Sequence, residues 1–516
     1  MDLQNNAVAK SSNMMLSIIT IFLTVFILRS AYIYIKSLRT NSPPLIGGYF
    51  PFIGCSLQFL LNPVGFINNA REKYGSVFTM HIAGLNITMC TDISHIKLFY
   101  NSKEDQVSLY GAVSTFFSCV LPIDVDKLSV FDAISLKKLK TAQHKIFPNM
   151  HQYLDTMIER TNKYFDEKES YGFYNYLGTR GKEQGLVDLY NILPPLIVSV
   201  NSMCIVAPEL SLPQYYHKFI ACIRTMDETL ESTALHVHKN FQWLHPSSRK
   251  AYSAFRELAS ILRDILIDRI DFRQERLDIL KLTSMDEFGE DLMYDANFLK
   301  SVFDNLETRN KMYAMTARIF SLVYAGGTVS KSVASCMIDL LRRPEYMKRV
   351  KEEQAHCKEK YSDLLTQLSE MHFLEACINE TCRRTTGPIV IRKLQKPLSL
   401  PQENLVIPQG HLMAISPYLL HHDPSTHKDP YVYDPSRWLN NNTDTTPGRV
   451  FHAFGGGSHA CVGMKMAIVE TKVIMGALLE RFDWEITNEV SPPDFSVAGL
   501  AKPVVPCILK YTRKQL

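Results

Sequence analysis

The chain has 516 residues, of which 46% are hydrophobic and 21% charged, and its formal net charge is +4. This is an ordinary globular balance with ample material for a large core, and a charge so near zero argues against nucleic acid as the main partner. The 11 cysteines are scattered without a Cys-x-x-Cys pair, so the sequence indicates neither a zinc ribbon nor a disulfide framework. We expect most of them to be small buried hydrophobic residues in a reducing compartment.

The first element is an apolar run from Met14 to Ile35 that is broken by a single charge, Arg29. About 20 apolar residues suffice for a helix to cross a bilayer, and the long side chain of an arginine near one end can reach the interface. A cleaved signal peptide is the alternative, but no clean small-residue cleavage site follows the run, which favours an uncleaved anchor. Lys36 and Arg39 follow the span, so the charge bias predicts that the body of the protein lies on the cytoplasmic side.

A proline-rich segment follows the anchor. Pro43, Pro44 and Pro51 cannot continue a helix and predict a stiff hinge. Beyond it, alternating apolar residues in "SVFTMHI" and "NITMCTD" predict a β-hairpin, and no linker, charge block or repeat divides the remaining chain. The predicted organisation is a tail over 1–13, a transmembrane anchor over 14–35, a hinge over 36–52 and one domain over 53–516.

Two helical patterns lie in the middle of the chain. The basic stretch "SLKKLKTAQHKIF", which contains Lys140, predicts a helix whose basic face either contacts a ligand or is simply solvated. The apolar pattern over 311–343 predicts a long helix, with Pro344 at the first position of the next one. Gly326 and Gly327 lie inside this long helix and cost roughly 1 kcal/mol each against alanine, so we expect a specific reason for them.

The segment "LEACINETCRRTTGPIVIR" places Glu380 and Arg383 three residues apart on one face of a predicted helix. A carboxylate and a guanidinium at this spacing can pair. In isolation such a pair is a routine surface salt bridge that contributes little to stability.

The strongest pattern is "FHAFGGGSHACVGMKMA", in which one cysteine lies among four glycines immediately before a helical pattern. Consecutive glycines indicate positive φ angles or a close approach to the backbone. We predict a helix from about Gly463 to Leu479, with Cys461 at its N-terminus, where the helix dipole and free N–H groups favour a thiolate, a strong ligand of iron. The alternative is a glycine-rich turn that carries an incidental buried cysteine.

Five residues of this stretch fit the pattern F-x-x-G-x-H/R-x-C-x-G. They are Phe454, Gly457, His459, Cys461 and Gly463. In this the sequence resembles the cytochrome P-450 family of haem-thiolate enzymes, and the resemblance spans from Pro43 to the C-terminus. It implies a mostly α cytochrome P-450 fold with a smaller β region, preceded here by one N-terminal transmembrane helix.

The resemblance also implies roles for individual residues. Cys461 would be the axial ligand of the iron in haem b (heme b), with Phe454 packed near the sulfur, and Gly457 and Gly463 would let the loop pass close under the porphyrin. His459, Arg392 and Lys140 would hold haem propionates; Leu136 stands where many members carry a tryptophan, which weakens the match around Lys140. Glu380, Arg383 and Arg437 would form a structural Glu-Arg-Arg triad that locks a helix to the segment before the cysteine loop.

The segment "YAGGTVS" resembles the family's A-G-x-acid-Thr-Thr segment, in which Gly326, Gly327, Thr328 and Ser330 are the candidate catalytic residues. The match is incomplete, because Thr328 stands at the acid position and Val329 at the alcohol position, and oxygen activation requires delivered protons. The favoured function is a monooxygenase that inserts one oxygen atom from O2 into a lipophilic substrate of sterol, terpenoid or fatty-acid type. Two alternatives stay open: a haem-thiolate isomerase or dehydratase that needs neither O2 nor a reductase, and a non-catalytic haem-binding protein.

The resemblance implies a set of partners as well. Electrons would come from NADPH through a membrane-bound reductase, with cytochrome b5 as a second candidate donor, and the protein would be a single-pass protein of the endoplasmic reticulum whose catalytic domain faces the cytoplasm. Lys465, Lys472 and Arg449 flank the cysteine loop and either form a basic docking face for the reductase or are ordinary solvated charges.

Overall fold

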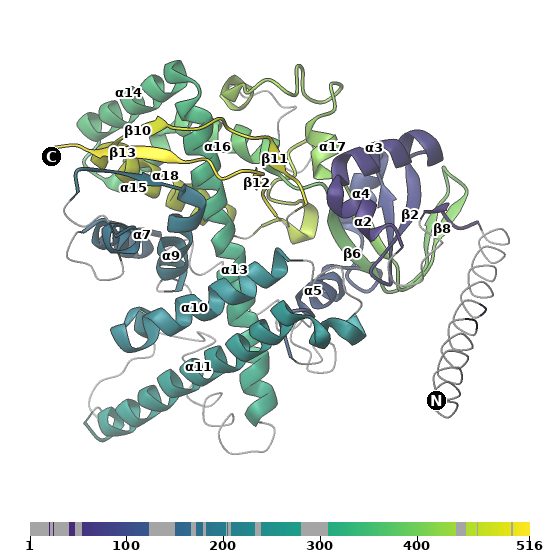
Figure 1. Cartoon of the computed structure of the whole chain (residues 1–516), viewed down its shortest axis with the longest axis horizontal. Helices are drawn as coiled ribbons and strands as arrows, with labels where there is room; N and C mark the ends of the chain where they lie inside the picture. Colours follow the sequence, from purple (N-terminus) through teal and green to yellow (C-terminus); the bar gives the residue numbers. More distant parts are fainter. Residues whose placement is uncertain are drawn as a thin grey trace, which may run out of the picture. The chain divides into compact units, whose positions relative to one another are not determined.

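The computed structural model describes residues 20, 24, 41–46, 54–122, 150–166, 172–178, 182–202, 204, 208–232, 239–279, 308–439, 450–461, 463–496 and 499–515. They group into two compact units (Figure 1). The smaller unit contains the described residues up to Leu109 together with Ile391–Ile415, and the larger unit contains the others.

The smaller unit is built on a mixed sheet of six strands in the order β1-β2-β3-β9-β6-β4, with a separate β7-β8 hairpin. The strands are β1 (Leu45–Ile46), β2 (Val77–Ile82), β3 (Leu85–Cys90), β4 (Val107–Ser108), β6 (Val390–Leu394), β7 (Leu398–Leu400), β8 (Leu405–Ile407) and β9 (Leu412–Ile415). The helices are α2 (Ser56–Leu61), α3 (Pro63–Tyr74) and α4 (Ser94–Asn101).

Strands β2 and β3 confirm the predicted hairpin. They pair antiparallel from Val77 opposite Cys90 to Ile82 opposite Leu85. The two residues between them, Ala83 and Gly84, have φ angles of 51° and 80°. Positive φ at both central positions matches the right-handed twist of the flanking strands, which is why this short turn closes the hairpin.

Part of the predicted hinge over 36–52 belongs to the sheet. Strand β1 pairs parallel with β2, with Leu45 opposite Thr79, and the backbone carbonyl of Asn41 accepts a hydrogen bond of 2.6 Å from the N–H of Val406. The carbonyl of Pro44 likewise accepts a hydrogen bond of 2.7 Å from the N–H of Thr79 in β2. Residues 41–46 are therefore an integral edge of the sheet.

The predicted anchor over 14–35 lies outside the described residues, apart from Thr20 and Thr24. Within the part of the chain that the structure describes, no helix has the length and apolar character needed to cross a membrane.

The larger unit is mostly helical. Its helices are α5 (Leu109–Phe117), α7 (Met150–Tyr164), α8 (Phe173–Tyr176), α9 (Leu189–Asn201), α10 (Pro213–Leu230), α11 (Pro246–Ile279), α13 (Thr308–Leu341), α14 (Pro344–Lys360), α15 (Leu364–Glu370), α16 (His372–Thr385), α17 (Pro417–His421) and α18 (Met464–Arg481). Single 3-10 turns are η3 (Pro208–Ser211), η5 (Lys239–Leu244), η6 (Pro435–Trp438) and η8 (Gly457–His459). Its strands are β5 (Gln184–Val187), β10 (Phe482–Ile486), β11 (Pro493–Asp494), β12 (Lys502–Pro503) and β13 (Leu509–Arg513), which form a β10-β13-β5 sheet and a β11-β12 pair.

Helix α13 runs through the middle of the larger unit (Figure 1). Its C-terminal half packs with α9, α16 and α18 in one buried apolar cluster, and its N-terminal half packs with α10 and α11 in another. Because α13 is apolar on several sides, it can be covered by both clusters at once, which explains its long apolar pattern in the sequence.

The two predicted helices appear within a few residues of their expected bounds. Helix α13 ends at Leu341, and Pro344 opens α14 at its first turn as predicted. Helix α18 begins at Met464, one residue after the predicted start. All eleven cysteines are free thiols and ten of them are buried, which confirms the absence of a disulfide framework.

Candidate active site

The cysteine loop connects a buried aromatic segment to α18. Gly455 and Gly457 have φ angles of 70° and 62°, which a side chain would strain, so these two glycines are required by the backbone path. The turn brings the N–H of Cys461 to the carbonyl of Phe454 at 2.8 Å. Cys461 thereby lies three residues before the start of α18 and is the one exposed cysteine of the chain.

The thiol of Cys461 is not a spontaneous thiolate. Although the residue is exposed, partial desolvation of the sulfur by the loop raises its pKa, and the N–H of Gly463 lowers it by a smaller amount. The expectation that the helix N-terminus alone would favour a thiolate is therefore wrong in this structure. A cationic ligand of sulfur would be needed to hold the deprotonated form.

Two aromatic residues of the pattern have defined positions. The ring of Phe454 packs edge-on against Phe451, with centroids 5.9 Å apart. The ring of His459 packs edge-on against Tyr110 of α5, with centroids 5.7 Å apart. The loop is thus fastened by Phe454 on one side and contacts α5 through His459 on the other.

Glu380 and Arg383 of α16 form a fully buried pair. Arg383 donates from Nε and Nη2 to the two carboxylate oxygens of Glu380 at 2.9 and 2.8 Å, and both side chains are 0% exposed. Nη1 and Nη2 also donate to the carbonyls of His421 and Pro430. A surface salt bridge, the bland expectation for this spacing, is therefore not what forms.

Arg437, the third predicted member, is the outermost of the group. Its Nε lies 3.6 Å from Oε1 of Glu380, beyond hydrogen-bond distance, and its Nη2 donates to the carbonyl of Asp429. The other hydrogen bonds to the carboxylate of Glu380 come from Trp438 Nε1 and from the backbone N–H of Asp434, each at 3.1 Å. Trp438 was not predicted as a partner of Glu380, although its position next to Arg437 in the sequence could have suggested this role.

Arg392 lies in β6 of the smaller unit and is 4% exposed. Its guanidinium lies over the ring of Phe99, and its Nη1 donates to the carbonyl of Ile391, while Nε has no hydrogen-bond partner among the described residues. Burial lowers the pKa of the guanidinium. A buried guanidinium whose Nε has no hydrogen-bond partner among the described residues is suited to an anionic group of a ligand. Lys140, the other predicted propionate ligand, lies outside the described residues.

The two glycines of α13, Gly326 and Gly327, have different surroundings. A Cβ at Gly326 would lie 2.5 Å from the side-chain amide of Asn201 in α9, whereas a Cβ at Gly327 would meet nothing within 4 Å. Gly326 therefore permits close packing of two helices, and Gly327 borders open space. The specific reason expected for the two glycines is thus close helix packing at Gly326, while the space beside Gly327 could admit a ligand.

The hydroxyl groups of Thr328 and Ser330 donate hydrogen bonds to backbone carbonyls of their own helix. Thr328 Oγ1 donates to the carbonyl of Ala325 at 2.8 Å, and Ser330 Oγ donates to that of Gly327 at 2.7 Å. Val329 between them is buried in the apolar core. Residues 328 and 330, rather than 329, thus carry the hydroxyl groups of this turn.

A pocket of about 320 Å³ reaches this turn from α10 and the C-terminal strands. Its lining includes Gly327, Thr328 and Ser330 together with Asp227 of α10 and Glu231, the residue that follows α10. Desolvation raises the pKa of Asp227 to about 6, while Glu231 accepts hydrogen bonds from Lys331 and Lys502. The pocket therefore brings a carboxyl group that titrates near neutrality into the same space as Thr328.

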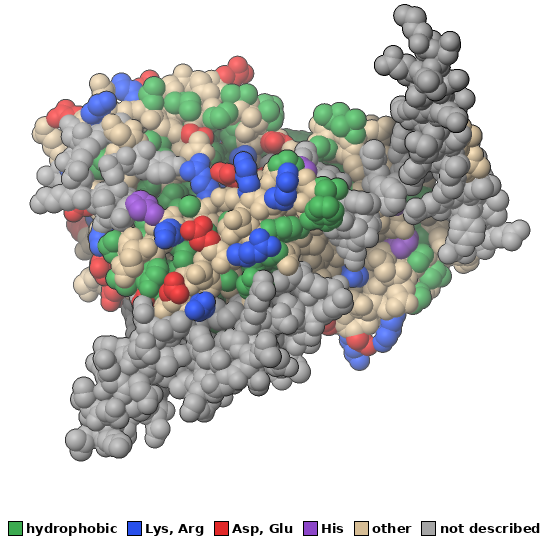
Figure 2. Space-filling view, turned by 60° about the horizontal axis from the view of Figure 1, so that its bottom comes forward, with side chains coloured by type: hydrophobic (Ala, Val, Ile, Leu, Met, Phe, Trp, Pro, Cys, Tyr) green, Lys and Arg blue, Asp and Glu red, His purple; other side chains and the backbone are tan. Residues whose placement is uncertain are grey.

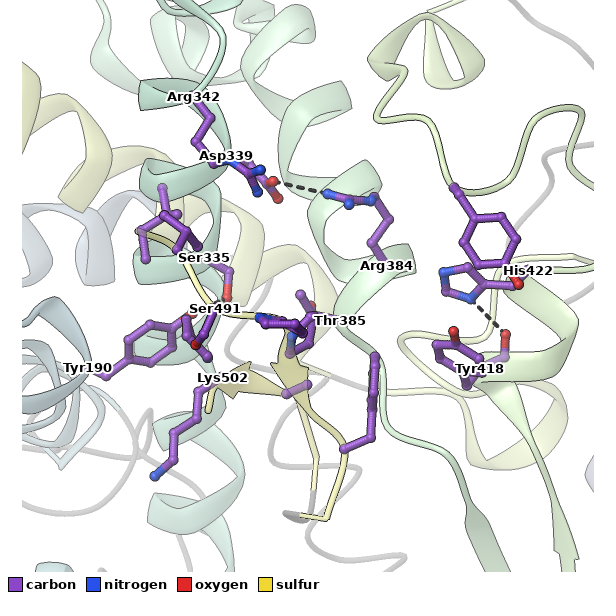
Figure 3. Close-up of a pocket in the computed structure, with 18 residues that line it drawn as sticks. Tyr190, Ser335, Asp339, Arg342, Arg384, Thr385, Tyr418, His422, Ser491 and Lys502 are labelled. Carbon is purple, nitrogen blue, oxygen red and sulfur yellow. Dashed lines mark hydrogen bonds and ion pairs between the residues drawn. The ribbon is translucent and has the colours of Figure 1, made fainter. Parts of the chain in front are cut away.

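A second pocket, of about 350 Å³, lies between α13, α16, α17 and the β11-β12 pair (Figure 3). In it Arg384 points toward Asp339 and donates to it at 3.0 Å, and Tyr418 stacks on His422 with centroids 4.1 Å apart. None of its lining residues belongs to the cysteine loop or to the turn of α13 that contains Gly327, Thr328 and Ser330. It is therefore separate from the candidate active site.

Of the three basic residues considered for a docking face, Lys472 is neither part of an exposed face nor a solvated charge. Lys472 is 2% exposed, and its Nζ donates to the carbonyl of Leu368 and to Glu375, each at 2.7 Å. Lys465 is exposed, and Arg449 lies outside the described residues. On the face shown in Figure 2, Lys and Arg side chains are interspersed with acidic and apolar ones.

The residues present fit a haem. Cys461 is exposed on a glycine-containing loop, and Arg392 is a buried cation whose Nε lacks a partner in the described part. Thiolate for iron and guanidinium for a propionate are the donor types that such a group needs.

A model of the cytochrome P-450 family matches residues 43–511. Among curated proteins, the chain is 22% identical to a lanosterol 14-alpha demethylase of Cunninghamella elegans over 515 residues, which cover 92% of each chain. It is 25% identical to a lanosterol 14-alpha demethylase of Rattus norvegicus, over 92% of this chain and 88% of that protein. It is also 25% identical to a sterol 14-demethylase of Arabidopsis thaliana, over 93% of each chain.

The family model covers the cysteine loop, the Glu380–Arg383 pair and the glycine-containing helix α13 together. The mostly helical fold with smaller sheets agrees with the same assignment. The chain therefore belongs to the cytochrome P-450 family and is a cytochrome P-450 monooxygenase.

Proposed function

We propose that this enzyme inserts one oxygen atom from O2 into a sterol or a similarly shaped lipophilic molecule. The observation that carries the choice of substrate is the end-to-end likeness to proteins named as sterol 14-demethylases, which extends over 92% or more of this chain. The identities of 22–25% leave the position of attack on the substrate open to experiment.

In this proposal Cys461 holds the iron of haem b, and Arg392, His459 and Lys140 hold the propionates. Haem bound through a thiolate supplies the oxygen-activating chemistry, because electron donation from sulfur favours cleavage of the O–O bond. Gly455 and Gly457 support this role, because their positive φ angles give the backbone the turn that precedes Cys461. The buried Glu380–Arg383 pair holds α16 against the segment that leads into the loop.

Protons reach the site through the pocket that contains Thr328. General-acid delivery requires a positioned hydroxyl group and an ionisable group nearby. Thr328 supplies the hydroxyl, and Asp227, with a pKa of about 6, supplies the ionisable group that position 328 itself lacks. Lys331 and Lys502 hold Glu231 in its ionised form beside Asp227, since both donate to its carboxylate.

The substrate space is bordered by α5 and α13. Phe116 and Phe117 of α5 pack against Tyr324 of α13, with ring centroids 6.2 and 5.6 Å apart. Apolar and aromatic walls with few polar groups suit a rigid lipophilic molecule.

The proposal includes electron supply from NADPH through a reductase, with cytochrome b5 as an additional donor, and an anchor over 14–35 in the endoplasmic reticulum membrane. The apolar run Met14 to Ile35 and the full-length likeness to rat and human lanosterol demethylases support this arrangement.

The test uses membranes that contain the full chain, a reductase and NADPH, incubated with a panel of sterols, terpenoids and fatty acids under isotopically heavy dioxygen. We expect mass spectrometry to detect a sterol product that gains one heavy oxygen atom and requires NADPH. Cys461→Ala should abolish it, whereas Cys357→Ala, at a buried cysteine of α14, should retain it. An unlabelled product that is isomeric with its substrate and forms without NADPH would overturn the proposal in favour of the isomerase that Val329 suggests.

A further inference from the structure

We propose that His421 is the positioning residue that couples the Glu380–Arg383 pair to the cysteine loop and thereby holds Cys461 in its ligating position. The inference rests on the proposed role of Cys461 as the iron ligand. His421 is the last residue of α17, and no pattern in the sequence singles it out.

Hydrogen bonds join His421 and Arg383 in both directions. Nδ1 of His421 lies 2.9 Å from the backbone carbonyl of Arg383, and Nη1 of Arg383 donates to the backbone carbonyl of His421 at 2.6 Å. Both side chains are 0% exposed. Neither contact can be replaced by water, so the two residues fix α17 against the end of α16.

The other nitrogen of the same ring holds the cysteine loop. The backbone N–H of His452 donates to Nε2 of His421 at 2.8 Å. This contact alone determines the tautomer: Nε2 accepts and therefore carries no proton, so Nδ1 carries it and donates to Arg383. The ring is thus a neutral bridge between the backbone of Arg383 and the backbone of His452.

Ring packing adds a second connection to the sulfur. His421 stacks on Phe451 with centroids 5.7 Å apart and an angle of 26°, and Phe451 packs edge-on against Phe454. The carbonyl of Phe454 accepts the N–H of Cys461 at 2.8 Å. One chain of contacts from Arg383 to Cys461 therefore passes through the rings of His421, Phe451 and Phe454. A parallel one starts at Glu380 and reaches Phe451 through Trp438, whose ring centroid lies 4.6 Å from that of Phe451.

The charges around the ring favour its neutral form. Burial is the main cause that lowers the pKa of His421, and the neighbouring rings of His452 and His427 and the guanidinium of Arg383 act in the same direction, while Glu380 is already paired with Arg383. A protonated ring would also lose the acceptor for His452. Only a neutral histidine offers one donor and one acceptor on a rigid plane at this spacing, which explains the residue type.

Two conservative variants separate the two nitrogens. His421→Asn places an amide near the position of Nδ1, and His421→Gln places one near the position of Nε2. Backbone amide exchange over Phe451–Cys461, measured by mass spectrometry with fragmentation on the haem-free full chain, reports on the loop directly. We expect the amide of His452 to exchange about tenfold faster in His421→Asn, which lacks its acceptor, and close to the wild-type rate in His421→Gln.

The second readout is the Soret band of the reduced carbon monoxide complex, which distinguishes thiolate from neutral sulfur ligation. We expect the thiolate fraction to fall in the order wild type, His421→Gln, His421→Asn and His421→Ala. His422→Asn is the matched control, because its ring stacks on Tyr418 and its Nδ1 contacts the carbonyl of Tyr418. It should leave the loop exchange and the Soret band unchanged.

Equal loop exchange and equal thiolate fractions in His421→Asn and His421→Gln would overturn the inference, even if both variants are less stable than the wild type. The haem-free exchange measurement keeps the test separate from the proposed function: a wild-type protein without a thiolate Soret band would refute the role of Cys461, whereas the link from His421 to the loop would still be decided by exchange.

Discussion

Glu470 of α18 is a buried carboxyl group whose protonation can be tested by its effect on stability. It is 1% exposed, and Nδ2 of Asn201 donates to its Oε1 at 3.5 Å. Desolvation raises its pKa to about 8 from the usual 4.5, so the folded protein keeps this proton at neutral pH. Glu470→Gln retains the size and the acceptor oxygen of the side chain and removes the titration.

The sign of the effect follows from the two pKa values. Between pH 4.5 and 8 the unfolded chain loses the proton while the folded protein keeps it, so stability falls as pH rises through this window. Each pH unit costs about 1.4 kcal/mol, or about 4 kcal/mol by pH 7.5. The free energy of unfolding of Glu470→Gln minus that of the wild type should therefore increase by about 4 kcal/mol between pH 4.5 and 7.5.

Urea unfolding followed by circular dichroism at several pH values measures this difference. Glu485→Gln, at an exposed position of β10, is the control and should run parallel to the wild type. If the curves of Glu470→Gln and the wild type are also parallel, Glu470 is ionised in the folded protein, and the reasoning from its burial is refuted.

Three further predictions concern stability. Gly326→Ala should lower the free energy of unfolding by about 1–3 kcal/mol, because its Cβ would lie 2.5 Å from the amide of Asn201. Gly327→Ala should raise it by about 0.5–1 kcal/mol, because its Cβ would meet nothing within 4 Å and alanine favours the helix. Equal shifts of the two variants in thermal unfolding would contradict this reasoning. Glu380→Gln should lower the free energy of unfolding by about 3–5 kcal/mol, because it leaves the buried Arg383 uncompensated. The loss should be larger than that caused by Arg437→Ala, since Arg437 lies 3.6 Å from the carboxylate at the edge of the group. The reverse order in urea unfolding would be evidence against this arrangement. Burial lowers the pKa of His422 to about 4, so its contribution to stability is complete above pH 6.5 and is lost as pH falls toward 4. His422→Gln should therefore reduce the loss of unfolding free energy over this window by up to about 1.4 kcal/mol per pH unit. An unchanged pH dependence of stability in this variant would show that the ring is charged in the folded protein.

Local patterns in the sequence determined the elements that carry the site. Glycine spacing around Cys461 predicted a loop with positive φ angles, and an apolar pattern predicted α13 to within three residues of its ends. The spacing of Glu380 and Arg383 predicted their pairing on one helix face. Each of these depends on backbone conformation or on neighbours within a few residues, which the order of residues specifies directly.

Tertiary structure alone decided which residues surround those elements. Trp438 donates a hydrogen bond to Glu380 across 58 positions of sequence, and Asn201 donates one to Glu470 across 269. Lys472 is buried against Glu375 rather than exposed. His421 likewise reaches Arg383 and His452 through contacts 38 and 31 positions apart. Such contacts have no periodicity along the chain, because they arise where separate helices and loops pack and each buried polar group must find its partner in space.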